Sequence, residues 1–427
     1  MNAARPGGSG LARRADPMLR GTLSHALILV LVGCGARSGF DQNEAPASLD
    51  LGTPVPVPAP RDAAPMPVDL PAPSPTCALV PRPGPVEIAR DRSGTFQWPQ
   101  GVARDGRFDL LATFAPFTDD RAPHLELHRV DGSLDERDLE GLGAPAAEVW
   151  AAGDGLDTTG LCFSRGAEVV LSTYTTDGER WSRTFEGTRC DGLAYGAGRW
   201  FMAVDSGFRM RGVVLEANGD VVTETADVGV PIDGTPSLGV TGSGDGFAFV
   251  QRPGPDGRLL VGTLSAEGDP NAFSLEGFAP AEATPVVASA GPLGGLAIAH
   301  HAPAGLRVTR VDPERGGVIA RSEPLGFDMG GEMRPALVPL ANGLLVASAS
   351  YGDFDPTRGR IQVDVLGPEL TVEDHWEVET QRIEPGLGAV GAATDGDAIV
   401  VYWAAAVGID PGAGGDPVTM AMSFTCD

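Results

Sequence analysis

The sequence contains no lysine: all 31 of its basic residues are arginine, set against 57 acidic residues, for a formal net charge of −26. Nucleic-acid-binding surfaces need clustered cations that face phosphates, so this charge argues against a nucleic-acid partner. Histidine (6) and cysteine (5) are also scarce and leave little material for a metal cluster. Hydrophobic residues nevertheless make up 42% of the chain, enough for most of it to bury a core.

Motifs that carry chemistry are missing as well. There is no G-x-S-x-G, H-E-x-x-H or C-x-x-C sequence and no phosphate-cradling glycine loop. We therefore assign no catalytic residue, no metal site and no cofactor from the sequence. The sequence is informative about cellular location, fold and disulfide bonds instead.

No hydrophobic run is long enough to span a membrane. The longest near the N-terminus, Ala26–Val32, has seven residues, which rise only about 10 Å as a helix, whereas a span needs about 20 residues. Four arginines, at positions 5, 13, 14 and 20, precede it. A basic segment followed by a short apolar run predicts a signal peptide over residues 1–33, and Met18 is a plausible true start.

The run ends in Leu31-Val32-Gly33-Cys34, which resembles the lipobox of bacterial lipoproteins. The resemblance implies cleavage before Cys34, diacylglycerol on its thiol and acylation of the new N-terminus. The mature chain would carry a formal charge of −29, which anionic headgroups repel, so the lipid alone would hold it at the membrane. In enterobacterial lipoproteins an Asp directly after the lipidated Cys favours retention in the inner membrane. This chain has Gly35 there, so we expect it in the bacterial outer membrane, facing the periplasm or the cell surface.

Residues 34–84 are predicted to form a disordered, proline-rich tether. Between positions 46 and 85 there are 13 prolines in 40 residues, many alternating as in Pro54–Pro60. Such a segment favours polyproline II and acts as a semi-rigid spacer.

A unit of about 48 residues repeats through the rest of the chain. Six apolar strands each follow a glycine turn, and a divergent copy with its turn at Gly155 fits between the first two. The strands are 108–114, 200–205, 247–252, 296–301, 344–349 and 398–403, after Gly106, Gly198, Gly246, Gly295, Gly343 and Gly396. Alternating strands and second turns at Gly132, Gly178, Gly219, Gly268 and Gly317 follow. Asn218-Gly219 and Asn342-Gly343 predict type I′ turns.

Four strands per unit without helical periodicity predict an all-β fold, a seven-bladed β-propeller over residues 85–427. The last unit lacks its outer strand, and Val86–Arg90 resembles an isolated outer strand, so we expect the N-terminal segment to complete the last blade. A six- or eight-bladed propeller and a pair of β-sandwiches remain alternatives.

Cysteine positions support this closure. Once Cys34 is assigned to lipid, four cysteines remain in an exported chain, which favours disulfides. Cys77 precedes the isolated strand and Cys426 ends the last one, so we predict a Cys77–Cys426 bond that contributes on the order of 4–5 kcal/mol. Cys162–Cys190 is then the second pair.

Several polar residues could bind a metal ion or could have ordinary structural roles. His300-His301 point to opposite faces of a strand and cannot chelate one metal together. His124 and His128 share a face but are well separated. The pairs Asp154/Asp157 and Asp353/Asp355 could bind Ca²⁺ weakly, yet such residues more often form turns. Thr175–Trp181 resembles the structural Asp-box hairpin of sialidase-type propellers, with a spacing one residue short.

These observations favour a non-enzymatic, monomeric lipoprotein whose propeller is a binding platform for an envelope protein or glycan. The alternative is a hydrolase or lyase with its active site in the central channel, because a single fold hosts many unrelated functions.

Overall fold

The computed structural model describes residues 77–426 apart from internal gaps. The gaps are 83, 118–122, 135–136, 143–148, 208, 230–237, 252–257, 277, 279–285, 290–292, 303, 327–333, 353–354, 382–389 and 408–415. The predicted signal peptide, Cys34 and nearly all of the predicted tether therefore lie outside the described residues. No helix in the described part is long and apolar enough to cross a membrane.

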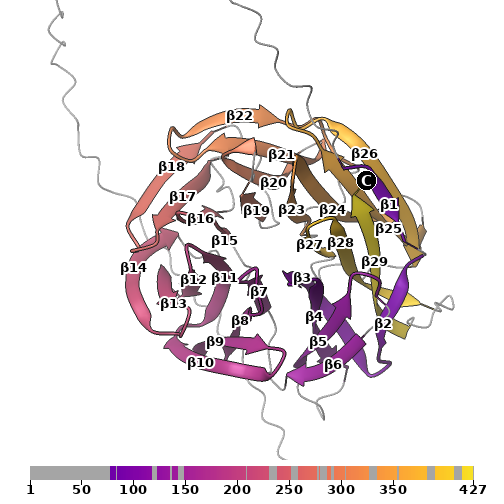
Figure 1. Ribbon diagram of the computed structural model, residues 1–427, viewed down its shortest axis with the longest axis horizontal. Helices are drawn as coiled ribbons and strands as arrows, with labels where there is room; N and C mark the ends of the chain where they lie inside the picture. The colour runs from indigo at the N-terminus through magenta and orange to yellow at the C-terminus, as the bar shows by residue number, and fades with distance from the viewer. Residues whose placement is uncertain are drawn as a thin grey trace, which may run out of the picture. The chain divides into compact units, whose positions relative to one another are not determined.

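Seven antiparallel sheets stand in a ring around a central axis, with the first strand of each sheet nearest the centre (Figure 1). We number these sheets as blades 1 to 7. Blades 1 to 3 consist of β3 (Gly94–Arg104), β4 (Arg107–Pro116), β5 (His124–Asp131), β6 (Arg137–Leu142); β7 (Val149–Gly153), β8 (Thr159–Arg165), β9 (Glu168–Thr175), β10 (Gly178–Glu186); and β11 (Arg189–Gly196), β12 (Arg199–Asp205), β13 (Met210–Glu216), β14 (Val221–Gly229).

The remaining blades follow the same order along the chain. Blades 4 to 6 consist of β15 (Leu238–Gly242), β16 (Gly246–Gln251), β17 (Leu259–Ser265), β18 (Pro270–Leu275); β19 (Val286–Ser289), β20 (Leu296–Ala302), β21 (Gly305–Asp312), β22 (Gly317–Arg321); and β23 (Ala336–Leu340), β24 (Gly343–Gly352), β25 (Asp355–Leu366), β26 (Val372–Gln381). Blade 7 consists of β27 (Val390–Asp395), β28 (Ala398–Val407) and β29 (Asp416–Cys426), with β1 (Leu79–Pro81) and β2 (Val86–Arg90). This is the predicted seven-bladed propeller, and the six- and eight-bladed and sandwich alternatives are wrong.

The hydrophobic core lies between the blades rather than inside any one of them. The described residues form seven hydrophobic clusters, and each joins two neighbouring blades, with the cluster of Phe108 and Tyr402 joining blade 1 to blade 7. We call each such contact a seam. Because a single blade is a sheet with two apolar faces, it is covered only when both neighbours are in place.

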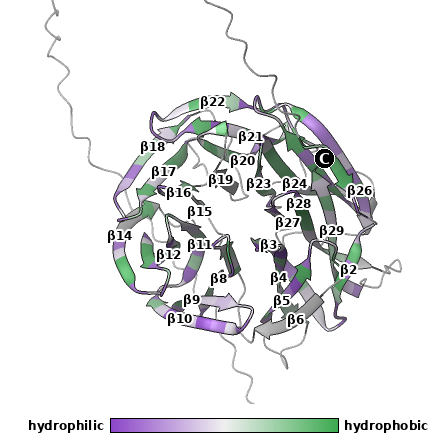
Figure 2. Cartoon of the chain, viewed as in Figure 1, coloured by the Kyte–Doolittle hydropathy of each residue, from purple (hydrophilic) through white to green (hydrophobic). Residues whose placement is uncertain are grey.

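Burial is greatest in the second strand of a blade and falls towards the outer strand. The second strand of blade 4, β16, is buried at every residue, whereas the outer strand β10 is mostly exposed and hydrophilic (Figure 2). All six apolar strands predicted from the repeat coincide with the second strand of a blade. Continuous burial on both faces explains their uninterrupted apolar sequences.

The ring closes through pairing of the two ends of the described chain. As predicted, Val86–Arg90 is an outer strand of blade 7: β2 pairs antiparallel with β29, with Val86 opposite Ala421. A shorter strand that the sequence analysis did not find, β1, pairs with the end of β29 and places Leu79 opposite Cys426. It lies upstream of the predicted propeller boundary at residue 85.

Both predicted disulfides are confirmed. Cys77–Cys426 joins the chain before β1 to the end of β29, across 349 residues. Cys162–Cys190 spans 28 residues and links β8 of blade 2 to β11 of blade 3 within the seam between them.

The type I′ prediction for two Asn-Gly turns is wrong. Gly219 has φ 87°, but Asn218 does not have a positive φ, and Gly219 N–H bonds Glu216 O at 2.9 Å. This is a type I turn followed by a left-handed glycine. Neither Asn342 nor Gly343 has a positive φ. In two equivalent outer turns a buried leucine, Leu134 or Leu370, takes the left-handed position instead of glycine.

Candidate ligand site in the central channel

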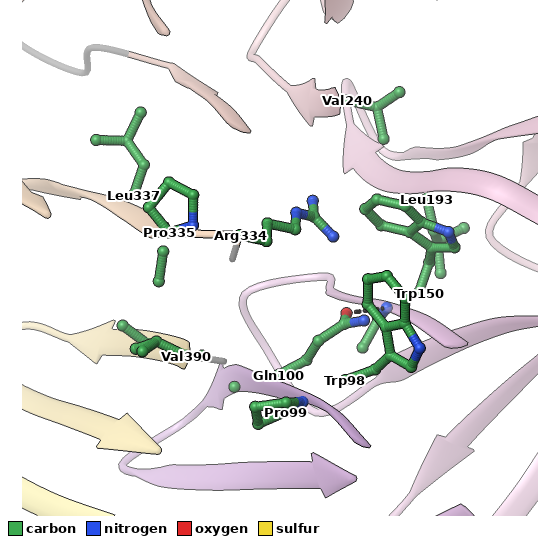
Figure 3. Close-up of a pocket in the computed structure, with 15 residues that line it drawn as sticks. Trp98, Pro99, Gln100, Trp150, Leu193, Val240, Arg334, Pro335, Leu337 and Val390 are labelled. Atoms are coloured by element: carbon green, nitrogen blue, oxygen red, sulfur yellow. Dashed lines mark hydrogen bonds between the residues drawn. The ribbon is translucent and has the colours of Figure 1, made fainter. Parts of the chain in front are cut away.

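The channel contains a hollow of about 180 Å³ lined by six of the seven blades (Figure 3). We call it the channel pocket. Its walls come from the inner strands β3, β7, β11, β15, β23 and β27 and from the two residues before β23. The lining residues are Trp98, Pro99, Gln100, Gly101, Trp150, Ala151, Leu193, Val240, Arg334, Pro335, Ala336, Leu337, Val390, Gly391 and Ala392. Residues distant in sequence therefore meet at the axis.

An irregularity in β3 brings Trp98 to the pocket. Trp98 has φ 53°, in the left-handed region, and the pairing of β3 with β4 shifts between Gln97 and Gln100. Pro99 has no backbone N–H and cannot continue the ladder, which accounts for a bulge at this point. A bulky residue in this conformation costs about 1–3 kcal/mol, and such strain is concentrated at functional sites.

Gln100 fixes the neighbouring inner strand. Its side-chain Oε1 accepts a hydrogen bond from Ala151 N–H at 2.8 Å, and its Nε2 donates to Val149 O. The amide thus replaces a strand partner for β7 on the channel side. This pins the inner strand of blade 2 to that of blade 1 beside Trp150.

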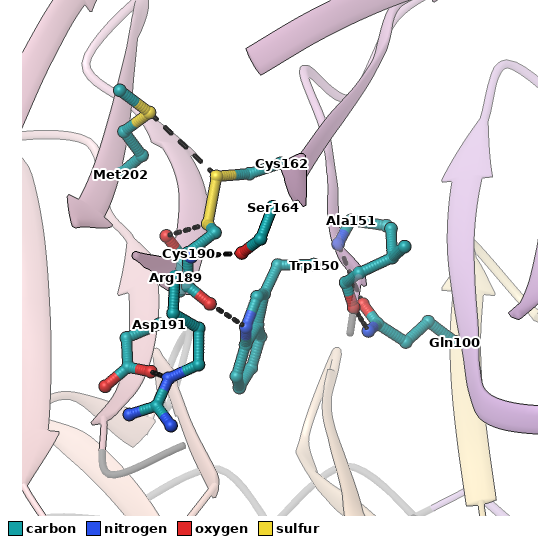
Figure 4. The surroundings of a disulfide bond; sticks show 11 residues. Gln100, Trp150, Ala151, Cys162, Ser164, Arg189, Cys190, Asp191 and Met202 are labelled. Atoms are coloured by element: carbon teal, nitrogen blue, oxygen red, sulfur yellow. Dashed lines mark hydrogen bonds and ion pairs between the residues drawn. A yellow bond between two sulfur atoms is a disulfide. The ribbon is translucent and has the colours of Figure 1, made fainter. Parts of the chain in front are cut away.

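Trp150 is held from behind by the seam between blades 2 and 3. Its indole N–H donates to Cys190 O at 3.0 Å, and Cys190 is bonded to Cys162 (Figure 4). Only 4% of Trp150 is exposed. The disulfide therefore backs one wall of the channel pocket.

Arg334 is the charged side chain among the lining residues. Its guanidinium carbon lies 3.9 Å from the centroid of the Trp150 ring, a cation–π contact. In Figure 3 the side chain extends from beside Pro335 into the middle of the pocket. No Asp, Glu or His contributes to the described lining, so these walls carry no acid–base pair.

The histidines singled out from the sequence lie elsewhere. His300 is buried between blades 4 and 5, where Nε2 lies 2.9 Å from Thr309 Oγ1 and the ring stacks edge-on against Phe278. Burial lowers the pKa of His300 to about 4, so it is neutral at pH 7. It serves the seam rather than a ligand.

His124 and His128 are brought closer than the sequence analysis expected. Both contact the residue between them on the same face of β5: His124 Nε2 lies 3.4 Å and His128 Nε2 3.3 Å from the Glu126 carboxylate. The described residues nevertheless contain no group of three His, Cys, Asp or Glu side chains arranged to hold a metal ion.

The aspartates near Gly155 form a turn. Asp154 Oδ1 accepts hydrogen bonds from the backbone N–H groups of Leu156 and Thr158, and Asp157 Oδ1 accepts from the Thr158 hydroxyl. Asp353 and the side chain of Asp355 lie outside the described residues.

The Asp-box-like segment also has a structural role. Asp177 N–H bonds Thr175 Oγ1 within the turn between β9 and β10. The Trp181 indole N–H donates to Ala217 O at 2.8 Å, which joins blade 2 to blade 3.

Sequence reasoning missed every polar or aromatic residue of the channel pocket. One signal was available: Trp98-Pro99 interrupts a strand that otherwise alternates, and a proline inside a strand marks an edge or a bulge. Arg334 carried no such signal, because nothing in its sequence neighbourhood places it at the axis.

No protein-family model and no curated protein matches the chain. Solved structures with a similar arrangement include TolB from Acinetobacter baumannii (12% identity, TM-score 0.43), for which the match covers 70% of this chain and 66%, just under two thirds, of that chain. A mitotic checkpoint complex structure gives 11% identity and a TM-score of 0.45, covering 83% of this chain and 98% of that chain. A subtype N10 neuraminidase-like protein of A/little yellow-shouldered bat/Guatemala/060/2010 gives 9% identity and a TM-score of 0.39, and the match covers 82% of this chain and 99% of that chain. These values are too low to carry a function over, and the fold assignment rests on the seven sheets.

Proposed function

We propose that this chain is a bacterial lipoprotein, anchored through Cys34 to the outer membrane, whose propeller binds an envelope protein or glycan in the channel pocket. The lipobox Leu31–Cys34 and the proline-rich segment after it support the anchor and the tether. The observation that carries the binding function is Arg334 stacked on Trp150 in a hollow whose other lining side chains are mostly apolar. Apolar walls with a few placed polar groups are typical of ligand sites.

The alternative of a hydrolase or lyase finds no support in the pocket. Such reactions need a positioned acid, base or nucleophile, and the described lining offers an arginine and an amide already bonded to β7. Binding is therefore the function that the site supports best.

The anchor is tested by metabolic labelling of the producing cells with an alkyne fatty acid. We expect the wild type to carry the label and to fractionate with the outer membrane, and Cys34→Ala to carry none. Label that persists on Cys34→Ala would contradict the lipobox assignment.

The binding function is tested by crosslinking the anchored protein in its own envelope and capturing it. We expect a partner that is recovered with the wild type and lost with Trp98→Ala combined with Arg334→Gln. Trp181→Ala, a tryptophan outside the pocket, is the matched control. A partner retained equally by all three proteins would place binding elsewhere on the propeller.

A further inference from the structure

The channel pocket is small. Its volume of about 180 Å³ is below the 300–1,000 Å³ typical of small-molecule sites. It admits a single residue-sized group, whether an amino-acid side chain or one sugar ring. The choice between them depends on the polar groups that the walls provide.

The lining side chains provide few partners for hydroxyl groups. Leu193, Val240, Leu337 and Val390 are apolar, and the one lining amide, Gln100, uses both its oxygen and its nitrogen on β7. A sugar ring carries hydroxyls around its whole edge, so those that face these side chains rather than the strand backbone would stay unpaired, at a cost of about 1–3 kcal/mol each. An apolar side chain carries no such cost.

Arg334 provides a site for one carboxylate. The Trp150 ring holds the guanidinium at 3.9 Å, and a planar guanidinium presents its N–H donors in a fork that matches a carboxylate. A guanidinium has five donors, so it can serve a ligand carboxylate together with another partner. The geometry suits a planar, bidentate acceptor.

The charge of the whole chain limits the ligand to few negative charges. At a formal −26, the protein repels a polyanion such as a uronic-acid polymer, whereas a single carboxylate beside an apolar group can share the guanidinium donors of Arg334. Charge complementarity therefore favours an apolar group that carries one carboxylate.

The inner strands can also bond an extended main chain. Each of β11, β15, β23 and β27 stands at the end of its sheet, with its sheet partner on the outer side only, whereas the equivalent edge of β7 is already bonded to Gln100. The channel-side edge of such a strand offers N–H and C=O groups to an incoming backbone, which a peptide has and a glycan lacks.

We infer that the channel pocket captures the carboxyl-terminal residue of a peptide, with the terminal carboxylate on Arg334 and an apolar last side chain against Leu193, Val240, Leu337 and Val390. The inference rests on the proposed binding function and specifies its ligand: a protein partner with a free, apolar carboxyl terminus. Trp98 lines the pocket beside the bound residue.

The test compares acetylated tripeptides ending in Leu, Val or Phe, each as the free acid and as the amide, by calorimetry on the full mature protein. We expect at least one free acid to bind, and its amide to bind at least tenfold more weakly. Arg334→Gln should weaken the acid at least tenfold and leave the amide unchanged, and Arg334→Lys should fall between. Arg321→Gln, which removes an arginine stacked on Phe278 outside the pocket, is the matched control and should bind like the wild type.

Equal affinity for acid and amide, or an unchanged affinity in Arg334→Gln, would overturn the inference. So would binding of an oligogalacturonate through Arg334, or failure of all six peptides. If the crosslinking capture still depends on Trp98 and Arg334 in those cases, the proposed binding function stands and only the peptide assignment falls. Melting temperatures confirm that each variant is folded.

Discussion

The two disulfides of the propeller connect the chain at very different distances. Cys77–Cys426 joins residues 349 apart at a half-buried position where the two ends of the chain meet in blade 7. Cys162–Cys190 joins residues 28 apart, is fully buried, and ties two blades that already follow one another.

The two disulfides therefore have different roles. Blade 7 is the blade whose outer strands come from the other end of the chain, and its pairing must overcome the entropy of closing the whole ring. Blades 2 and 3 are joined by a short connection in any case, so their disulfide adds less to closure. It instead fixes Cys190, whose carbonyl oxygen holds Trp150 at the channel pocket.

The largest effect is expected from opening the ring. Cys77→Ala with Cys426→Ala should lower the free energy of unfolding by about 5 kcal/mol, because the denatured chain regains the freedom of a very long loop. Urea unfolding followed by circular dichroism measures the change. Peptide affinity in the channel pocket should stay unchanged. A loss smaller than that of the second pair would mean that β1 and β2 close the ring without covalent help.

Removing the second disulfide should lower the free energy of unfolding less than removing the first, but should weaken ligand binding in the channel pocket more. Cys162→Ala with Cys190→Ala should lower the free energy of unfolding by about 3.5 kcal/mol on the same chain-entropy argument. Because Trp150 then loses a fixed acceptor, the affinity of the pocket should fall severalfold. The same calorimetric titration measures it. An unaffected pocket would show that Gln100 and Arg334 suffice to hold this wall.

The seam between blades 4 and 5, which has no disulfide among its described residues, should be the acid-sensitive one. His300 packs there with its pKa lowered from 6.5 to about 4. Its neutral form is favoured in the fold, so its contribution is complete above about pH 6.5 and is lost as the pH falls towards 4, by up to about 3 kcal/mol.

Urea unfolding at pH 7 and at pH 4.5 measures this loss. His300→Gln, which keeps a polar group near Thr309, should show a shallower fall between the two pH values than the wild type. The half-exposed His375→Gln is the control. Equal slopes for His300→Gln and the wild type would assign the acid sensitivity to other groups.

The smallest effect is expected from a hydrogen bond between blades 2 and 3. Trp181→Phe keeps most of the ring but removes the hydrogen bond to Ala217 O, and it should cost about 1 kcal/mol. A urea midpoint identical to that of the wild type would mean that water replaces this bond without loss, and that the disulfide dominates the seam.

Local features of the sequence were sufficient to predict the fold. The repeat length follows from four short strands per blade, and uninterrupted apolar strands such as 247–252 follow from burial on both faces. The position of Cys77 before a strand without a partner, and of Cys426 after the last strand, was enough to predict closure. These features are periodic or terminal, so one chain shows them without knowledge of contacts.

The turns mark the limit of such reasoning. A glycine pattern predicted where the chain reverses, but not which residue takes the left-handed conformation. In blades 1 and 6 that residue is Leu134 or Leu370, whose side chain is buried in a seam. Packing between blades outweighs the local preference for glycine there.

The sequence by itself determined the blade number, the closure by the N-terminal strand and the cysteine pairing, because each depends on order along the chain. Only the tertiary structure decided the channel pocket. Trp98, Trp150 and Arg334 come from different blades. Each lies at the start of an inner strand, just before it, or at a bulge within it, and belongs to no sequence motif. They meet because seven blades converge on one axis, a property of the closed ring that no segment carries alone.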